Sequence, residues 1–393
     1  MGGGQPPANS DGKYKVTHNI VILGGAGFIG SRLALRLQDR GHQVRVLDNL
    51  SPQVHGNDPE ASPLLRTIRG KVEFIRGSVT NRDDLLHALR GMDTVVHLAA
   101  ETGTGQSMYA IRHYTDVNVG GTALLLDLIA NESLPISKLV VASSRAIYGE
   151  GKYHCARHGA VFPPSRSAAA MQNGLFDIPC PTCGSPTELV PTDEDTPARP
   201  SSVYGITKLN QEQLVLTVGG ALGIAALALR YQNVFGPGQS LTNPYTGILS
   251  IFSTRIRNGH DINIFEDGKE SRDFVFIDDV IDATTRAVEF KQPVVAALNV
   301  GSGVATDVMT VATTLQKLLG ISVPTTVSGK FRIGDIRHNI ADLTRVRAVL
   351  NFEPSTAFET GMRSFVEWVK GETIQEDRYE RSLEELRRRG LFK

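Results

Sequence analysis

The stretch GGAGFIG, residues 24–30, lies between an apolar, β-branched run (NIVIL) and a segment with helical periodicity that stops at Gly41. Gly24, Gly27 and Gly30 form a GxxGxxG pattern in it. The first two glycines let the backbone turn tightly and approach a pyrophosphate, and the third lets the helix pack closely on the strand. The N-terminus of that helix would face the phosphates. The stretch therefore predicts a strand–turn–helix unit that binds a dinucleotide.

The next expected strand, QVRVLDN (43–49), supports this prediction through its acidic end. Asp48 lies 18 residues after Gly30. A carboxylate in this position hydrogen-bonds the adenosine ribose hydroxyls and repels a 2′-phosphate, so it favours NAD over NADP. A turn or helix-capping role for Asp48 is the alternative, and the neighbouring glycine pattern favours the cofactor role.

Strands and helices are expected to alternate outward from this unit. The expected strands are 19–25, 43–49, 72–79, 94–100, 138–144 and 225–234, and the expected helices are 28–41, 83–91, 116–132 and 201–220. The alternation predicts an α/β fold, a Rossmann-type doubly wound parallel sheet. Residues 150–195 interrupt it as an insertion rich in Pro, His, Cys and Ser. Residues 1–17 are expected to be a disordered tail.

Composition narrows the class of protein. Lys plus Arg and Asp plus Glu are equal at 41 each, so no basic excess points to a nucleic-acid or membrane partner. Three cysteines are too few for a disulfide framework and favour a reducing compartment. The N-terminal residues contain no apolar leader segment. We therefore expect a cytoplasmic protein.

Two polar groups suggest proton-transfer chemistry. Tyr204 and Lys208 are four residues apart in an expected helix, so they share a face. A nearby ammonium would lower the pKa of the phenol and let it act as a base near neutral pH. Ser143 and Ser144 end an expected strand, and strand carboxyl ends border the ligand crevice of a doubly wound sheet.

These motifs together resemble a known family. GGAGFIG, HLAA, ASSRAIYG, YGITK and RDFVFIDDV, in this order, are similar to the extended short-chain dehydrogenase/reductases, and more narrowly to their nucleotide-sugar epimerase/dehydratase branch. The resemblance covers roughly residues 18–370. It implies a tightly bound NAD, with Tyr204 as the base, Lys208 on the nicotinamide ribose and Ser144 as the helper hydroxyl. Ser143 is the alternative helper.

The resemblance also implies a set of cofactor contacts. They are Gly24, Gly27, Phe28, Ile29, Gly30, Asp48, Asn49, Ser78, Val79, Leu98, Ala99, Ala100, Asn118, Tyr204 and Lys208. Val79 would pack beside the adenine, and Asn118 would support the cofactor side. Ser78 stands where the family usually has Asp, which removes one adenine contact.

The residues after Ser144 indicate which reaction follows. In the family, 4,6-dehydratases carry an Asp–Glu pair there for proton transfers, whereas this chain has Arg145 and Ala146. The resemblance therefore favours a 4-epimerase, which oxidises C4 transiently and returns hydride to the other face. A 4-keto reductase, a uronate decarboxylase, and a non-catalytic NAD-binding interaction protein are the alternatives.

The family motifs further imply where a nucleotide-diphosphate sugar would bind. Asn233, Arg272 and Arg332 match diphosphate-binding positions, and Gln106, Ser107 and Ser144 are candidate sugar-side contacts. Residues 18–235 would form the NAD-binding domain. Residues 236–265 and 293–393 would form a smaller nucleotide-sugar-binding domain, with 266–292 returning to the first.

Several stretches narrow the resemblance to a subfamily. DNLSPQVHG, GQSMY, IYGEGKYHC and NPYTGILSIF are similar to dTDP-L-rhamnose 4-epimerases, which form dTDP-6-deoxy-L-talose. The family also implies a homodimer through two helices, for which 105–132 and 201–220 are the candidates.

The insertion contains all three cysteines. Cys155 and His158 form a CxxH pair, and Cys180 and Cys183 a CxxC pair. Two such pairs supply four donors for a tetrahedral, structural zinc ion with no position left for water. His154 is an alternative fourth ligand. The other possibilities are three incidental thiols, a redox CxxC and a nucleic-acid zinc ribbon, and the zero net charge disfavours the last.

Overall fold

The computed structural model describes residues 17–241, 243 and 247–393. Of the expected disordered tail at 1–17, only Thr17 belongs to the described residues. Part of the NPYTGILSIF stretch also lies outside them. In the described part of the chain, no helix combines the length and apolar character needed to cross a membrane.

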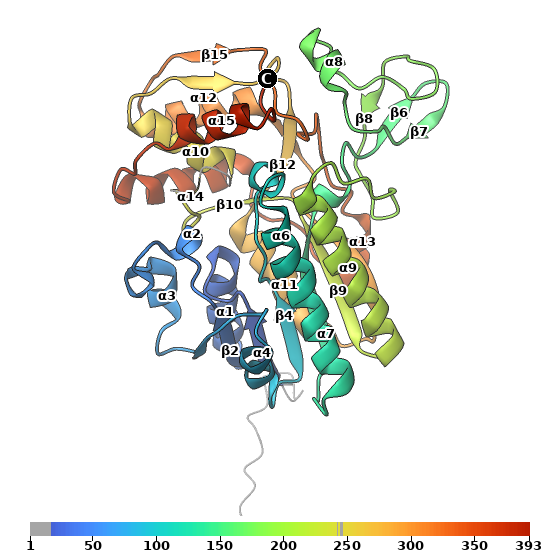
Figure 1. Ribbon diagram of the computed structural model, residues 1–393, viewed down its shortest axis with the longest axis vertical. Coiled ribbons are helices and arrows are strands. Elements are labelled where there is room, and N and C mark those ends of the chain that lie inside the picture. The colour runs from blue at the N-terminus through green and yellow to red at the C-terminus, as the bar shows by residue number, and fades with distance from the viewer. Residues whose placement is uncertain (1–16, 242, 244–246) are drawn as a thin grey trace, which may run out of the picture.

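A seven-stranded parallel sheet forms the centre of the fold (Figure 1). Its strands run in the order β13-β9-β5-β4-β1-β2-β3. Their bounds are β1 Asn19–Leu23, β2 Gln43–Asp48, β3 Glu73–Arg76, β4 Thr94–His97, β5 Lys138–Ser144, β9 Ala225–Tyr231 and β13 Val295–Val300. All neighbouring strands pair in parallel. The predicted Rossmann-type doubly wound sheet is therefore confirmed.

Helices cover both faces of this sheet because its strands are apolar on both sides. Ile20 and Ile22 of β1 belong to one buried cluster, whereas Val21 and Leu23 belong to another. The first cluster includes α1 (Phe28–Asp39) and α11 (Ile277–Glu289), and the second includes α4 (Arg82–Leu89), α7 (Gly121–Asn131) and α9 (Val203–Leu222). Side chains that alternate along one strand thus bind the two helical layers to it.

Short elements connect the core units. They are α2 (Pro52–His55), η1 (Pro59–Ala61), α3 (Pro63–Ile68), α5 (Thr104–Ser107), α6 (Ile111–Tyr114), the π-helix η2 (Thr115–Gly120) and η3 (Arg145–Ile147). The helix expected at 116–132 is thus a π-helical turn followed by α7.

The C-terminal part adds two small sheets. One has the order β10-β12-β14, with β10 Asn233–Phe235, β12 Ser271–Phe276 and β14 Ala305–Asp307, and the other pairs β11 (Ile262–Ile264) with β15 (Thr325–Val327). The helices are α10 (Ile248–Arg257), α12 (Val308–Leu319), α13 (Thr344–Leu350), α14 (Phe358–Gly371) and α15 (Tyr379–Arg388). Most of them lie together at the upper left of Figure 1.

The strand pairing crosses the expected domain bounds. β13 lies inside the segment 293–393 and is the edge strand of the main parallel sheet. β12 lies inside 266–292 and pairs with β10 and β14. Strand pairing is a long-range property that the local apolar pattern of a short strand does not reveal, and the domain division stays a prediction.

The insertion forms a small lobe of its own. β6 (Tyr153–Cys155) pairs antiparallel with β7 (Gly159–Val161) and β8 (Glu188–Leu189), and α8 (Ala168–Gln172) lies between β7 and β8 in the chain. In Figure 1 this green lobe stands beside the C-terminal elements, at the end of the main sheet where β5 leads into it. The sequence did not predict secondary structure in this segment.

Candidate active site

The glycine-rich turn has the geometry that a bound pyrophosphate requires. Gly24 has φ +76°, and a Cβ there would lie 2.7 Å from the backbone of Ala99. A Cβ on Gly30 would lie 2.6 Å from the Gly24 carbonyl oxygen. At Gly27, by contrast, the nearest protein atom would be 3.5 Å away. Packing within the protein explains the first and third glycines, and Gly27 leaves the turn open for a ligand.

The start of α1 fits the same ligand. Its N-cap is Gly27, which has no side chain to satisfy the first amide groups, and its first turn contains no acidic residue. Uncapped amides at a helix N-terminus form an anion site. Asp48 lies beside this turn and accepts hydrogen bonds from the Ala26 and Leu50 amides at 3.0 and 2.8 Å. The residues present therefore fit NAD.

The other expected cofactor residues lie at neighbouring strand ends. Asn49 follows β2, Ser78 and Val79 follow β3, and Leu98, Ala99 and Ala100 follow β4. These strands are close neighbours in the sheet, so their carboxyl ends meet around the glycine turn. Phe28 and Ile29 begin α1 in the same region.

Asn118 supports these strand ends from the protein interior. It is fully buried and accepts the Glu101 amide hydrogen at 2.7 Å. Its amide nitrogen donates to the Glu101 carbonyl at 3.1 Å and to Thr207 Oγ1 at 2.9 Å. Asn118 therefore holds the loop after β4 against α9, which carries Tyr204.

The structure brings Ser144 and Tyr204 together. Burial raises the pKa of the Tyr204 phenol, whereas a hydrogen bond with the Ser144 side chain lowers it. The alternative helper, Ser143, donates its hydroxyl to Glu212 Oε2 at 2.5 Å and is buried. Of the two serines, only Ser144 faces the phenol.

Lys208 is buried one turn further along α9. Its ammonium donates to Gln211 Oε1 at 2.7 Å, and burial lowers its pKa to about 7. Beside the Ser144 hydrogen bond, the positive charge of Arg145 lowers the pKa of Tyr204. The effect of Lys208 on the phenol stays a prediction.

The sequence did not reveal the electrostatic role of Arg145. The motif comparison indicates only that Arg145 stands where dehydratases have an acid, whereas in the structure it begins η3 directly after Ser144. Burial, and then the neighbouring Arg272, lowers the pKa of its guanidinium. Two cations that disfavour each other beside a phenol form a region suited to an anionic ligand.

Replacing Arg145 with Gln should shift the pH dependence of catalysis. A base works only when deprotonated, so kcat/KM falls as pH falls through its pKa. Without the Arg145 charge the pKa of Tyr204 rises, and the acid limb should move to higher pH by about one unit. A pH–rate series of Arg145→Gln against Arg363→Gln, an exposed-surface control, measures this. An acid limb that does not move would show that the Arg145 charge does not act on the phenol.

Asn233, which the family motif implies as a diphosphate contact, contains a polar atom that the described part of the protein leaves unsatisfied. Among the described residues its buried Oδ1 has no hydrogen-bond partner. Such an orphaned acceptor is costly unless a ligand donor satisfies it.

The two predicted phosphate-binding arginines differ. Arg272 donates to the carbonyl oxygens of Ser271, Ile336 and Arg337 at 2.8 to 3.0 Å, and no ion pair involves it in the described part of the chain. Arg332 pairs with Asp335, whose Oδ2 lies 2.8 Å from its Nε. Arg272 therefore has the less neutralised charge.

The two predicted sugar contacts on α5 are tied to protein groups. Ser107 is fully buried, accepts the Tyr204 amide hydrogen at 3.0 Å and donates to the Thr104 carbonyl at 2.7 Å. Gln106 exchanges two amide hydrogen bonds with Gln53, at 3.0 and 3.1 Å. Ser107 thus positions the start of α9, and its expected sugar contact stays a prediction.

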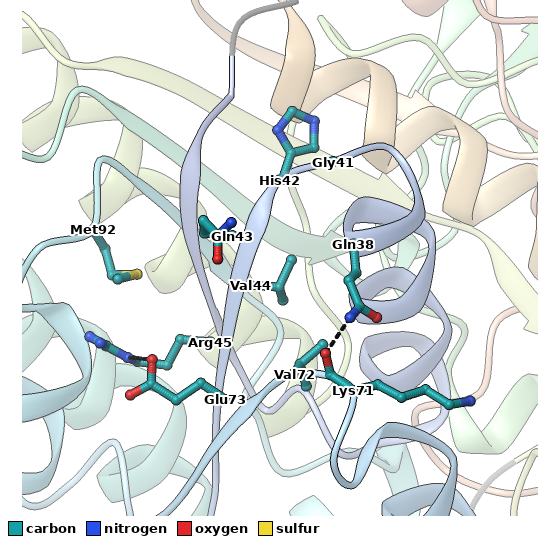
Figure 2. Close-up of a pocket in the computed structure, with 10 residues that line it drawn as sticks. All are labelled: Gln38, Gly41, His42, Gln43, Val44, Arg45, Lys71, Val72, Glu73 and Met92. Carbon is teal, nitrogen blue, oxygen red and sulfur yellow. Dashed lines mark hydrogen bonds and ion pairs between the residues drawn. The ribbon is translucent and has the colours of Figure 1, made fainter. Parts of the chain in front are cut away.

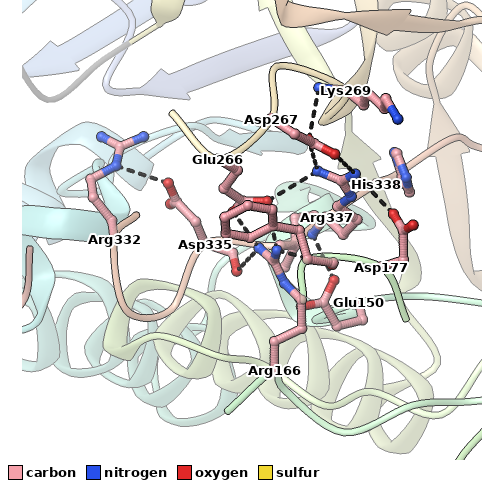
Figure 3. Close-up of polar contacts among 12 residues, drawn as sticks. Glu150, Arg166, Asp177, Glu266, Asp267, Lys269, Arg332, Asp335, Arg337 and His338 are labelled. Carbon is pink, nitrogen blue, oxygen red and sulfur yellow. Dashed lines mark hydrogen bonds and ion pairs between the residues drawn. The ribbon is translucent and has the colours of Figure 1, made fainter. Parts of the chain in front are cut away.

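An ion-pair network that the sequence did not reveal borders the same region (Figure 3). Arg166 of the insertion pairs with Glu150 at 3.1 Å and with Glu266 at 2.7 Å. Arg337 pairs with Asp267 at 2.6 Å and with Asp177 at 2.9 Å. No local pattern could predict this network because its members are spread along the chain from Glu150 to Arg337.

A hollow of about 300 Å³ lies elsewhere (Figure 2). It is lined by Gln43, Val44 and Arg45 at the start of β2 and by Glu73 at the start of β3, where Arg45 and Glu73 form an ion pair at 2.9 Å. Ligands of open α/β sheets bind at the carboxyl ends of the strands. The hollow is at the opposite end, so it is not the active site.

A phenol hydrogen-bonded to a serine, at the same carboxyl edge of the sheet as a glycine-rich turn that fits NAD, is an arrangement for moving a proton and a hydride together. The fold and the site thus define an extended short-chain dehydrogenase/reductase. The sequence profile described as the NAD dependent epimerase/dehydratase family matches residues 20–167 and 180–301. The chain belongs to this family, and it is an isomerase that uses NAD.

Known proteins agree with this assignment. The chain is 38% identical over 357 residues to the dTDP-L-rhamnose 4-epimerase of Burkholderia thailandensis, covering 90% of this chain and 95% of that one. It resembles the structure of UDP-glucose 4-epimerase with UDP-glucose from Thermotoga maritima, with a TM-score of 0.71, 27% identity and coverage of 90% and 99%. MoeE5 in complex with UDP-glucuronic acid and NAD gives a TM-score of 0.70 at 27% identity, with the same coverage.

Proposed function

We propose that the protein is a 4-epimerase of a nucleotide-diphosphate sugar, and that this sugar is dTDP-L-rhamnose, converted to dTDP-6-deoxy-L-talose. The observation that carries the reaction type is the Ser144–Tyr204 pair, followed by Arg145 and Ala146 instead of dehydratase acids. The substrate is supported by the 38% identical relative of that specificity. Structural neighbours that bind UDP-glucose and UDP-glucuronic acid make other sugar nucleotides the competing substrates.

The proposed chemistry assigns proton movement to the chain. Tyr204 accepts the proton of the C4 hydroxyl while C4 loses hydride, and a 4-keto sugar forms. NAD, when bound at the glycine-rich turn, would supply the hydride acceptor for the oxidation and the hydride donor for the reduction. Ser144 hydrogen-bonds the C4 oxygen and the phenol, which keeps the proton path short. Tyr204 then gives its proton back as C4 is reduced from the opposite face.

The proposed substrate site uses Asn233, Arg272 and Arg332, which keep hydrogen-bonding capacity or positive charge available for a ligand. The free Oδ1 of Asn233 and the unpaired charge of Arg272 are suited to the diphosphate, and Arg332 can add its remaining donors. Lys208 would meet the nicotinamide ribose from α9. A homodimer is also proposed, through the helices within 105–132 and 201–220. Ile111 of α6 and Ile206 of α9 lie in these segments and are 52% and 47% exposed. Measuring the mass of the protein in solution tests this proposal.

Incubation with dTDP-L-rhamnose should produce a second dTDP-sugar that differs only at C4. Proton NMR of the sugar follows the conversion, with no added NADH, because hydride returns to the carbon that lost it. UDP-glucose and UDP-glucuronic acid are the parallel substrates. Turnover of either one with none of dTDP-L-rhamnose would overturn the substrate, and consumption of added NADH would favour a reductase.

A further inference from the structure

The insertion lobe contains a four-ligand cluster that the epimerase chemistry does not use. The ligand atoms of Cys155, His158, Cys180 and Cys183 all lie within 4.8 Å of one another. We propose that these four residues bind one Zn²⁺ ion, which is structural and which holds the lobe against the substrate side of the enzyme.

The spacing of the ligand atoms matches a tetrahedral zinc site. Bond lengths of about 2.3 Å to sulfur and 2.0–2.1 Å to nitrogen predict edges of about 3.8 Å between sulfurs and about 3.6 Å between sulfur and nitrogen. The Cys155 and Cys183 sulfurs are 3.8 Å apart. His158 Nδ1 lies 3.7 Å from the Cys155 sulfur and 3.5 Å from the Cys180 sulfur. A disulfide would need about 2.05 Å.

Both ligand pairs lie in tight turns that end in glycine. The His158 amide donates to the Cys155 carbonyl at 3.2 Å, and the Gly184 amide donates to the Cys180 carbonyl at 2.8 Å. Each pair is followed by a glycine with positive φ, Gly159 at +67° and Gly184 at +71°. A tight turn that ends in a left-handed residue directs two donors to one point. The two turns differ in span by one residue, but each brings its own pair of ligand side chains together.

The lobe needs such a cross-link because its own core is small. Its buried cluster consists of Tyr153, Cys155, Val161, Ile178 and Cys180, so two of the five members are proposed ligands. A core of this size stabilises little by burial alone, and small modules commonly add a metal. Four protein ligands leave no position for water, so the ion would not be catalytic.

His154 is not part of the cluster. It alternates with Tyr153 and Cys155 along β6, where both neighbours are buried and His154 is exposed. Successive side chains of a strand point to opposite faces. The alternation excludes His154 as the fourth ligand and makes it a control for substitution.

The stretch between the two ligand pairs extends to the substrate side. Arg166 donates from Nη1 and Nη2 to both carboxylate oxygens of Glu266, at 2.7 and 2.8 Å, and from Nε to Glu150 at 3.1 Å (Figure 3). Arg166 Nη2 also donates to the Asp335 carbonyl at 3.0 Å. Asp335 is the ion-pair partner of Arg332. One lobe residue thus connects the end of β5 with the segment that carries a proposed phosphate-binding arginine.

The backbone conformation of Glu266 indicates that the Arg166–Glu266 contact is held in place. Glu266 has φ +49°, a left-handed conformation that a non-glycine residue adopts only when its surroundings hold it. Met171 and Phe176 of the lobe pack on Phe331, the residue before Arg332. The family profile is interrupted between 167 and 180, within this same stretch. The zinc ion would therefore fix a segment that the family profile does not match beside the sugar-nucleotide site.

Metal analysis of the purified full-length enzyme tests the site without reference to activity. We expect about one zinc per chain, and substitution by Co²⁺ should give the intense visible bands of a tetrahedral thiolate site. Protein that contains no zinc, takes up none when it is added, and has three freely titratable thiols would overturn the proposal.

Cys183→Ser is the best substitution because Cys183 is exposed, so the change leaves no buried cavity. It should abolish stoichiometric zinc, whereas His154→Ala should retain it. Zinc retained at full occupancy in Cys183→Ser would contradict the ligand assignment. If the variant does not fold, the zinc content and cobalt spectrum of the unaltered enzyme still decide.

The effect of the zinc-bound lobe on sugar-nucleotide binding rests on the proposed function, and it is measured separately from the zinc content. Cys183→Ser and Arg166→Ala should each raise KM for the sugar nucleotide about tenfold with little change in kcat, and NAD should stay bound. Arg166→Ala should keep its zinc. An unchanged KM in both variants would overturn the coupling while leaving the metal result intact, and failure of every sugar nucleotide would instead count against the proposed function.

Discussion

Tyr204→Phe is expected to lower kcat by about 10³-fold or more, while the purified variant still contains NAD. The phenol is the group that would accept and return the C4 proton, and general acid–base catalysis by one side chain contributes about 10²–10⁴-fold. Loss of the partner of Ser144 adds to the effect. Turnover is measured by NMR of the sugar, and cofactor content by absorbance after denaturation.

A second tyrosine offers a matched control for this substitution. Tyr153 is buried, and in the described part of the chain its hydroxyl has no hydrogen-bond partner. Tyr153→Phe removes the same atom from β6 of the insertion lobe, where it is not part of the proposed proton transfer, so kcat should stay close to the unaltered value. Equal activity in Tyr204→Phe and Tyr153→Phe would disprove a role of Tyr204 in proton transfer.

Glu212→Gln should destabilise the fold by about 3 kcal/mol, because removing one member of a buried ion pair leaves the other charge uncompensated. Arg230 donates to both Glu212 carboxylate oxygens, at 3.0 and 2.6 Å, and both side chains are buried. Glu212 also accepts the Ser143 hydroxyl hydrogen, so the pair anchors the end of β5 to α9. Denaturant titration followed by circular dichroism measures the change.

An exposed pair serves as the control for Glu212. Glu384 and Arg388 are four residues apart on α15, with their charged atoms 2.6 Å apart and their side chains largely exposed. Glu384→Gln should cost about 0.5 kcal/mol or less. In Glu212→Gln/Arg230→Met, removal of the orphaned charge should recover part of the lost stability. If Glu212→Gln lowers the free energy of unfolding by no more than Glu384→Gln does, the buried Glu212–Arg230 pair does not contribute much to stability.

The order of the Rossmann elements could be predicted because it depends on short-range patterns. Apolar runs such as β1 and β5 and the glycine turn at Gly24 carry their signal within a few residues. Tyr204 and Lys208 were found through their spacing, and Ser144 through its place at a strand end. Their family motifs added what spacing alone could not, namely the reaction class.

Long-range contacts account for what the sequence did not predict. Arg145 acts on Tyr204 only because η3 and the start of α9 are adjacent in space. Arg166 and Glu266 are 100 residues apart in the chain. β13 joins the main sheet by pairing with β9, and the sequence of β13 alone does not predict this pairing.

The sequence by itself determined the NAD-binding turn, the choice between dehydratase and epimerase motifs, and the four donors of the insertion, because each is a local arrangement of residue types. Only the tertiary structure showed which of Ser143 and Ser144 contacts the phenol, placed the charge of Arg145 near it, and separated His154 from the four-ligand cluster. In each case the deciding quantity is the position of a side chain relative to residues that the chain brings near only by folding.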